Sequence, residues 1–129
     1  DLILVDGKFS VRTHFRIEGD GEDINSPCIP IRTVRPDTLV EKGDIRAPDL
    51  IKVDVQGYGA KALKGSIISI KQRLPIILFS SHSRLELEET RRILVPLGYK
   101  AFDGKGREIG WDSFKSPWNQ TSILNASNK

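Results

Sequence analysis

The fold class follows mainly from residues 48–83, which read PDLIKVDVQGYGAKALKGSIISIKQRLPIILFSSHS. Apolar residues dominate Leu50–Val55, which is expected to be a strand covered on both faces because its sequence alternates little. After a glycine turn, apolar residues recur at helical spacing and predict one helix over Gly59–Arg73. Pro75 stops that helix from continuing, and Pro75–Ser80 is expected to be a second strand.

The residues that follow repeat this order. Ser83 and Glu86 match a capping box, in which the serine caps a helix and the glutamate reaches back to its start. The helix is expected to run to about Leu97, where Gly98 can end it in a left-handed turn. Tyr99–Asp103 is then a third strand. Strand, helix, strand, helix, strand predicts βαβ units, and hence an α/β fold with a mostly parallel sheet and flanking helices.

The 129 residues are expected to form a single domain. Asp6-Gly7 between two apolar runs predicts an N-terminal β-hairpin. Residues 1–30 are therefore assigned to this hairpin and a loop, residues 31–110 to the βαβαβ core, and residues 111–129 to a tail. Smaller elements are expected as well: a strand over Ile31–Val34, a helical turn over Pro36–Glu41 and a strand over Thr121–Asn125. The sequence has no methionine and starts at Asp1, which predicts a processed chain or a fragment of a longer one.

Composition narrows the function classes. The net charge is only +3, and the 20 basic residues are interleaved with 17 acidic ones, so no basic stripe favours nucleic acid as a partner. No apolar run approaches the length of a membrane span, and no signal peptide is recognised. Cys28 is the single cysteine, which excludes an internal disulfide and suits a reducing compartment. We therefore expect a cytoplasmic protein with neither a nucleic-acid nor a membrane partner.

No metal site is expected either. The oxygen-rich run from Asp20 to Asn25 lacks the twelve-residue EF-hand pattern and its terminal glutamate. A solvated acidic loop is the better interpretation of this run.

Two side chains stand where strands of such a sheet end. Asp54 lies at the carboxyl end of the first strand, the edge at which open parallel sheets bind ligands. It is a candidate for holding a substrate hydroxyl or the amino-acid group of a cofactor, the alternative being a cap of the following turn or helix. His82 lies just past the second strand and is a candidate general base, the alternative being a loop histidine beside the cap. Gly57 suits a positive φ angle, and Gln56 can hydrogen-bond a ligand but cannot act as a base.

The chain resembles the FkbM family of S-adenosylmethionine-dependent methyltransferases. The resemblance rests on LIKVDVQG, ALKG and PII, at residues 50–57, 62–65 and 75–77, supported by IRTV, DTL and LGY, at residues 31–34, 37–39 and 97–99. It covers roughly Ile31 to Phe102. It implies a partial Rossmann-like methyltransferase sheet, S-adenosylmethionine as cofactor and O-methyl transfer to a sugar or small metabolite. It also implies site residues: Asp54 and His82 as catalytic, and Gln56, Gly57 and Ser80 as substrate-binding.

This sequence departs from the family pattern at three acidic positions. Gln56 and Gly59 stand where the family usually has glutamate, and Ser80 stands where an acid commonly precedes the histidine. No segment before Ile31 resembles the glycine-rich cofactor turn, so the cofactor-binding residues are not identified and the chain looks like the carboxyl-terminal half of such an enzyme. Two alternatives stay open: a non-catalytic binding module, or a fragment whose exposed sheet edge pairs with another chain or a second copy.

Overall fold

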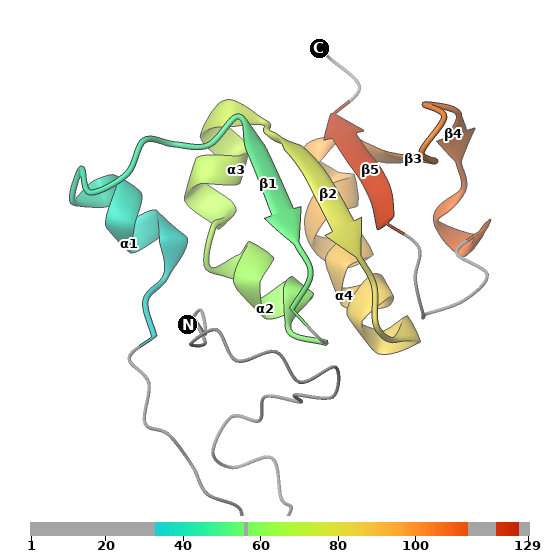
Figure 1. The fold of residues 1–129 in the computed structure, drawn as a ribbon, viewed down its shortest axis with the longest axis horizontal. Coiled ribbons are helices and arrows are strands. Elements are labelled where there is room, and N and C mark those ends of the chain that lie inside the picture. Colours follow the sequence, from blue (N-terminus) through green and yellow to red (C-terminus); the bar gives the residue numbers. More distant parts are fainter. Residues whose placement is uncertain (1–32, 56, 114–120, 127–129) are drawn as a thin grey trace, which may run out of the picture.

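The computed structural model describes residues 33–55, 57–113 and 121–126, which form a mixed α/β fold (Figure 1). The five strands are β1 (Leu50–Val53), β2 (Ile76–Ser80), β3 (Tyr99–Phe102), β4 (Glu108–Ile109) and β5 (Thr121–Ala126). The helices are α1 (Pro36–Glu41), α2 (Gly59–Lys64), α3 (Ile67–Arg73) and α4 (Arg84–Leu94), with short 3₁₀ turns η1 (Val95–Leu97) and η2 (Trp111–Ser113). The hairpin expected within residues 1–30 lies outside the described residues.

The sheet has the order β1-β2-β5-β3-β4. β1 and β2 are parallel, with Val53 opposite Phe79, whereas the other three pairings are antiparallel. The prediction of a mostly parallel sheet was therefore wrong. The reason is that β5 inserts between β2 and β3 and takes the hydrogen bonds that a parallel β2–β3 pair would have made. Because β5 is antiparallel to both neighbours, β1, β2 and β3 still point in one direction.

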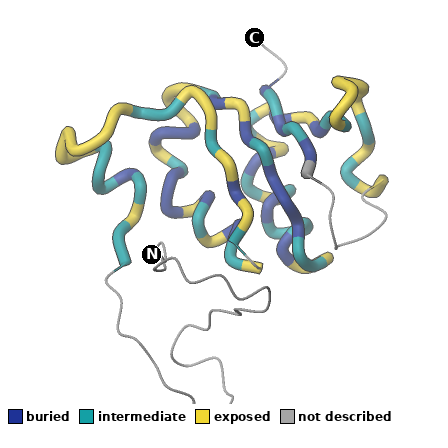
Figure 2. Tube along the Cα trace, viewed as in Figure 1, coloured by how far each residue is buried: buried dark blue, intermediate teal, exposed yellow. Residues whose placement is uncertain are grey.

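Helices α2, α3 and α4 lie on one face of the sheet, and α1 packs against α3 beside it. Figure 1 shows α3 and α4 behind the strands, and Figure 2 shows the buried residues that lie between these layers. In β2, Ile77 and Phe79 are fully buried while Ile76 is 41% exposed, and in β1 Val53 is buried while Lys52 is exposed. Coverage of both faces, expected from the sequence, is thus wrong for the described part of the chain. The core comprises Val53, Leu63, Ile70, Ile77, Phe79, Leu94, Tyr99, Ala101, Leu124 and Ala126.

The helix expected over residues 59–73 is broken into α2 and α3 at Gly65 and Ser66. The start of α3 is capped from a distance. Asp37, in α1, accepts hydrogen bonds from the backbone N–H of Ile68 at 2.9 Å, and from the N–H and Oγ of Ser69 at 3.0 and 2.7 Å. An aspartate is a good acceptor for the free N–H groups of a helix start. Here that acceptor comes from another helix, which the local sequence does not reveal.

Asp37 makes the α1–α3 contact sensitive to acid. Burial by itself raises the pKa of Asp37, but the hydrogen bonds from Ser69 and Ile68 and the charge of Arg35 together hold it below its usual value of 3.8. A lowered folded-state pKa contributes stability above the unfolded value of 3.8, and this stability is lost as the pH falls through the folded pKa. Acid is therefore expected to weaken this contact.

Asp37→Ala is expected to lower the free energy of unfolding by about 1.5–3 kcal/mol at neutral pH, because the buried N–H of Ser69 and the partly buried N–H of Ile68 lose a charged acceptor. Urea denaturation at neutral pH and near pH 3 measures this loss, which should shrink at the lower pH. Asp44→Ala, at an exposed aspartate next to the same helix, is the matched control. Equal losses in the two variants would contradict the assigned cap.

Local signals at α4 and β3 were confirmed. Ser83 Oγ accepts from the N–H of Glu86 at 3.1 Å and caps α4, and Gly98 adopts φ +82° after η1. Tyr99 then donates its hydroxyl to the carbonyl of Pro75 at 2.7 Å, and burial raises the pKa of this phenol to about 12. The helical turn over Pro36–Glu41 and a strand near residues 121–125 were also confirmed. The strand expected over residues 31–34 was wrong for its described half, since residues 33 and 34 form neither helix nor strand.

Candidate functional site

Asp54 and His82 lie together at the carboxyl edge of β1 and β2. Asp54 directly follows β1 and His82 follows β2 by two residues. Because the two strands are parallel and in register, both chains leave the sheet at the same edge. His82 Nε2 is 2.8 Å from Asp54 Oδ1, and the two side chains are 18% and 40% exposed. The pair is thus ordered by a direct contact and still reaches the surface.

The hydrogen bond determines which imidazole nitrogen can accept a proton. An ionised carboxylate only accepts hydrogen bonds, so in the neutral ring the hydrogen is assigned to Nε2, which donates to Asp54. Nδ1 then carries the lone pair, and within the described residues it has no hydrogen-bond partner. A positioned imidazole nitrogen of this kind can take a proton from a hydroxyl. Lys52 Nζ lies 3.9 Å from the second oxygen of Asp54, an exposed contact that adds little stability.

Glu86 connects the two loops that carry this pair. The residue is only 2% exposed. Its Oε1 accepts from the N–H of Gly59 at 2.7 Å, and its Oε2 accepts from the N–H of His82 at 2.7 Å. The capping-box expectation was therefore wrong in its second half, because Glu86 reaches past the start of its own helix to the residue before the cap and to α2. The sequence signal identified the residue but not these partners.

The turn between β1 and α2 depends on two glycines. Gly57 has φ +90°, as expected, and is exposed. Gly59 is buried, and a Cβ there would lie 2.7 Å from both Glu86 Oε1 and Phe79 Cε2. Between them, the Tyr58 ring lies 4.8 Å below Lys61 Nζ, a cation–π contact. Gly59 is therefore required by close approach of the Glu86 carboxylate and not by its backbone angles.

The positions of the other predicted site residues do not by themselves assign them a role beside the Asp54–His82 pair. Ser80 ends β2, is only 8% exposed and stands opposite Thr121 of β5. Gln56 lies outside the described residues. The roles of Gln56, Gly57 and Ser80 in substrate binding, like the catalytic roles of Asp54 and His82, stay predictions.

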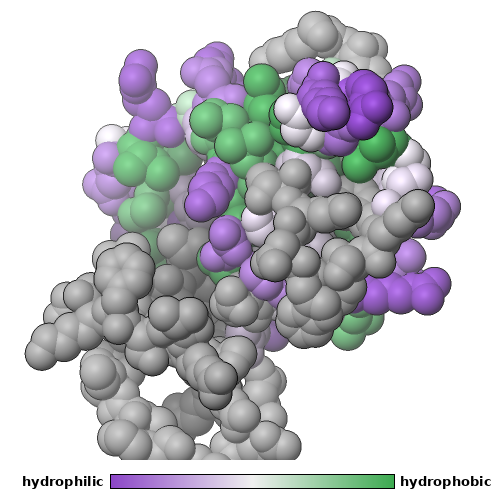
Figure 3. Space-filling view, turned by 45° about the vertical axis from the view of Figure 1, so that its right-hand side comes forward, coloured by the Kyte–Doolittle hydropathy of each residue, from purple (hydrophilic) through white to green (hydrophobic). Residues whose placement is uncertain are grey.

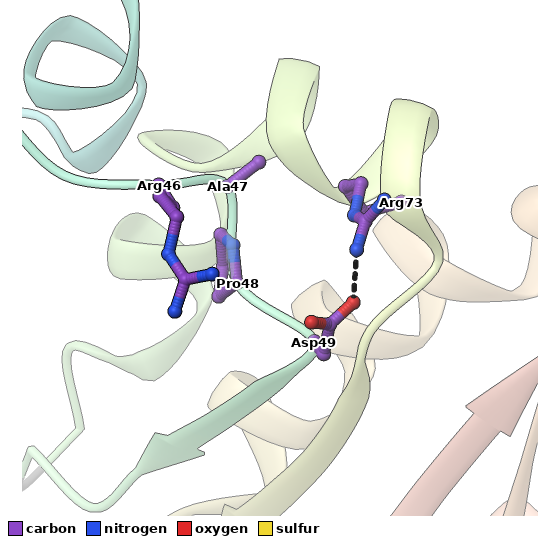
Figure 4. Close-up of a pocket in the computed structure, with 5 residues that line it drawn as sticks. All are labelled: Arg46, Ala47, Pro48, Asp49 and Arg73. Carbon is purple, nitrogen blue, oxygen red and sulfur yellow. Dashed lines mark hydrogen bonds and ion pairs between the residues drawn. The ribbon is translucent and has the colours of Figure 1, made fainter. Parts of the chain in front are cut away.

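A surface hollow of about 540 Å³ lies at the other end of β1 (Figure 4). Its lining residues are Arg46, Ala47, Pro48, Asp49 and Arg73. Asp49 immediately precedes β1 and pairs with Arg73, whereas Asp54 follows the strand. The hollow therefore lies at the opposite end of β1 from the Asp54–His82 pair.

The described residues contain neither a grouped set of metal ligands nor a membrane-spanning helix. Among residues 33–55, 57–113 and 121–126, no three His, Cys, Asp or Glu side chains are grouped as a metal site would require. Over the same ranges, none of the helices has the length and apolar character needed to cross a membrane.

Comparison with known proteins places this sequence in a family. Residues 5–101 match the model of the methyltransferase FkbM domain. The chain belongs to this family. The match starts at residue 5, so it extends further upstream than the segment 31–102 on which the resemblance was based. The family match and the curated relative described below support a methyltransferase-like function for this domain.

A curated relative is the hexuronic acid methyltransferase AglP of Haloferax volcanii. It is 30% identical over 64 residues, which cover 50% of this chain and 26% of that protein. The match thus spans about a quarter of the length of the relative. No solved structure matches the chain.

FkbM methyltransferases generally use S-adenosylmethionine. The described residues offer contacts for only part of this cofactor. Asp54 offers a carboxylate to an ammonium or hydroxyl group. The Gly57-Tyr58-Gly59 turn opens α2 as anion-binding turns do, but the N–H of Gly59 already donates to Glu86, which fills the position of an anion. Within the described part of the chain, the cofactor as a whole has no evident cradle.

Proposed function

We propose that this chain forms the acceptor side of an S-adenosylmethionine-dependent O-methyltransferase that acts on a hydroxyl of a sugar or small metabolite. The observation that carries the proposal is the exposed Asp54–His82 pair at the carboxyl edge of β1 and β2. Membership of the FkbM family supports methyl transfer, and the name of the Haloferax relative supports a sugar acid as acceptor. In this proposal the described strands are the carboxyl-terminal part of a Rossmann-like sheet, with β1, β2 and β3 sharing one direction.

The proposed roles follow from the geometry of the pair. His82 Nδ1 takes the proton of the acceptor hydroxyl, which makes the oxygen a better nucleophile. Asp54 holds the ring through Nε2 and stabilises the imidazolium that forms, as carboxylates do in other carboxylate–histidine pairs. When bound, S-adenosylmethionine supplies an electrophilic methyl group. The residues that bind S-adenosylmethionine are not identified.

Calorimetric titration with S-adenosylmethionine tests the cofactor part of the proposal, using both the 129-residue chain and the full-length gene product. Micromolar binding by either supports the enzyme. Binding by the longer product alone would assign the cofactor contacts to residues outside this sequence. No binding by either would favour a non-catalytic module.

The acceptor is tested with methyl-labelled cofactor, a hexuronic acid and the matching neutral hexose. Transfer to a hydroxyl gives an ether that survives mild alkali, whereas transfer to the uronic carboxyl gives an ester that does not. An alkali-stable product from both sugars is the expected result. An exclusively alkali-labile product would contradict O-methylation of a hydroxyl.

A second candidate function is an interaction module that pairs through its sheet edge. Within the described sheet β1 is an edge strand, and Leu50 and Ile76 stand opposite each other with 56% and 41% of their surfaces exposed. Figure 3 shows one face of the molecule, on which hydrophobic surface lies beside hydrophilic side chains. An open edge of this kind can pair with a second copy. Sedimentation equilibrium tests this candidate, and a monomer at every concentration would count against it.

A further inference from the structure

We propose that Glu86 is a positioning residue for the Asp54–His82 pair. Its buried carboxylate joins the loop after β2 to the start of α2, and so keeps the His82 ring within hydrogen-bond distance of Asp54. The inference rests on the proposed function only in that this pair handles the acceptor proton.

The first support is that both oxygens of Glu86 are used, one on each loop. Oε2 accepts from the N–H of His82, the residue whose ring contacts Asp54, and Oε1 accepts from the N–H of Gly59 in the turn after β1. Both bonds are 2.7 Å long, which is typical of a charge-assisted hydrogen bond. One carboxylate therefore fixes the backbone of the histidine relative to the strand that ends at the aspartate.

The second support is that Glu86 itself has little freedom. It is 2% exposed, and its own N–H donates to the Ser83 side chain at 3.1 Å. Space for its carboxylate exists because residue 59 has no side chain, since a Cβ there would lie 2.7 Å from Oε1. Because the Glu86 side chain has so little freedom, the two backbone N–H groups that donate to it are held in fixed positions as well.

A purely structural role makes a different prediction. If Glu86 served only to satisfy two buried N–H groups, its loss would lower stability and leave the His82–Asp54 hydrogen bond as it is. If Glu86 positions the pair, its loss must change the environment of His82 Nε2. The chain has only two histidines, which makes this nitrogen easy to follow by NMR.

The experiment uses the 129-residue chain with ¹⁵N-labelled histidine. Glu86→Gln keeps the size of the side chain but replaces one carboxylate oxygen by an NH₂ group. This group cannot accept a hydrogen bond from a backbone N–H, so one of the two bonds is lost. Glu89→Gln, on the same helix and with the same change of charge, is the control. Asp54→Asn supplies the reference signal for a weakened pair. The His82 Nε2 resonance is expected to move towards this reference in Glu86→Gln and to stay in place in Glu89→Gln.

A measurement on the unaltered chain covers the case in which Glu86→Gln does not fold. The amide N–H groups of Gly59 and His82 both donate to the Glu86 carboxylate, so scalar couplings across these hydrogen bonds should connect both amide nitrogens to the side-chain carboxyl carbon of Glu86. Absence of either coupling, or a folded Glu86→Gln with an unchanged Nε2 resonance, would overturn the inference. Failure of methyl transfer in every assay would reject the proposed function without altering these spectra, so the two failures are distinguishable.

Discussion

His82→Gln is expected to lower kcat for methyl transfer by about 10²- to 10⁴-fold, the usual contribution of a positioned general base. Glutamine keeps a polar side chain but cannot take the hydroxyl proton. Asp54→Asn should act in the same direction, because an amide no longer stabilises the imidazolium that forms on His82. Steady-state kinetics with labelled S-adenosylmethionine, on the full-length gene product, measures kcat and KM separately.

Asp49→Asn is the matched control, since Asp49 and Asp54 flank the same strand at opposite ends. This substitution removes the partner of Arg73 at the surface and should leave kcat unchanged. The double variant of Asp54 and His82 should lose little more than His82→Gln alone, because residues that act as a unit are not additive. Wild-type kcat in His82→Gln would remove the base from the proposed mechanism.

Leu94→Ala is expected to lower the free energy of unfolding by about 2–5 kcal/mol, the range for large-to-small changes in a core. Leu94 is fully buried at the last turn of α4, within the cluster that joins this helix to the sheet. Domains are typically stable by only about 5–15 kcal/mol, so the loss is a large share of the total. Urea denaturation followed by circular dichroism gives the midpoint and slope from which the loss is calculated.

Leu85→Ala makes the same chemical change on the same helix. Leu85 is 70% exposed, so its truncation removes little buried apolar surface and should change the free energy of unfolding by no more than about 0.5 kcal/mol. If the two variants were equally destabilised, the assignment of the inner face of α4 would be wrong. The comparison also bears on the site, because α4 carries Glu86.

Part of the site could be predicted because its signals are local. Val53 and Phe79 each end an apolar run, and Asp54 and His82 follow these runs closely in sequence. Two parallel neighbours place such residues at one edge without further information. The cap at Ser83 needs only the spacing of two residues in one turn, which the chain itself prescribes.

Other features could not be predicted because their partners lie far away in sequence. Asp37 caps a helix 31 residues further on, and Glu86 bonds to Gly59 across 27 residues. The six residues of β5 run antiparallel to β2 and β3 and lie between them. This position is favoured because it buries Leu124 and Ala126. No short pattern around these residues encodes such a choice.

The sequence by itself determined most of the elements, the family likeness and the two residues at the strand ends, because turns, caps and hydrophobic periods act over a few neighbouring residues. Only the tertiary structure decided that β5 separates β2 from β3, and that Glu86 leaves its own helix start to hold His82 and Gly59. The physical reason is the same in both cases. A buried backbone group must find a hydrogen-bond partner, and which partner is within reach is settled only when distant segments pack together.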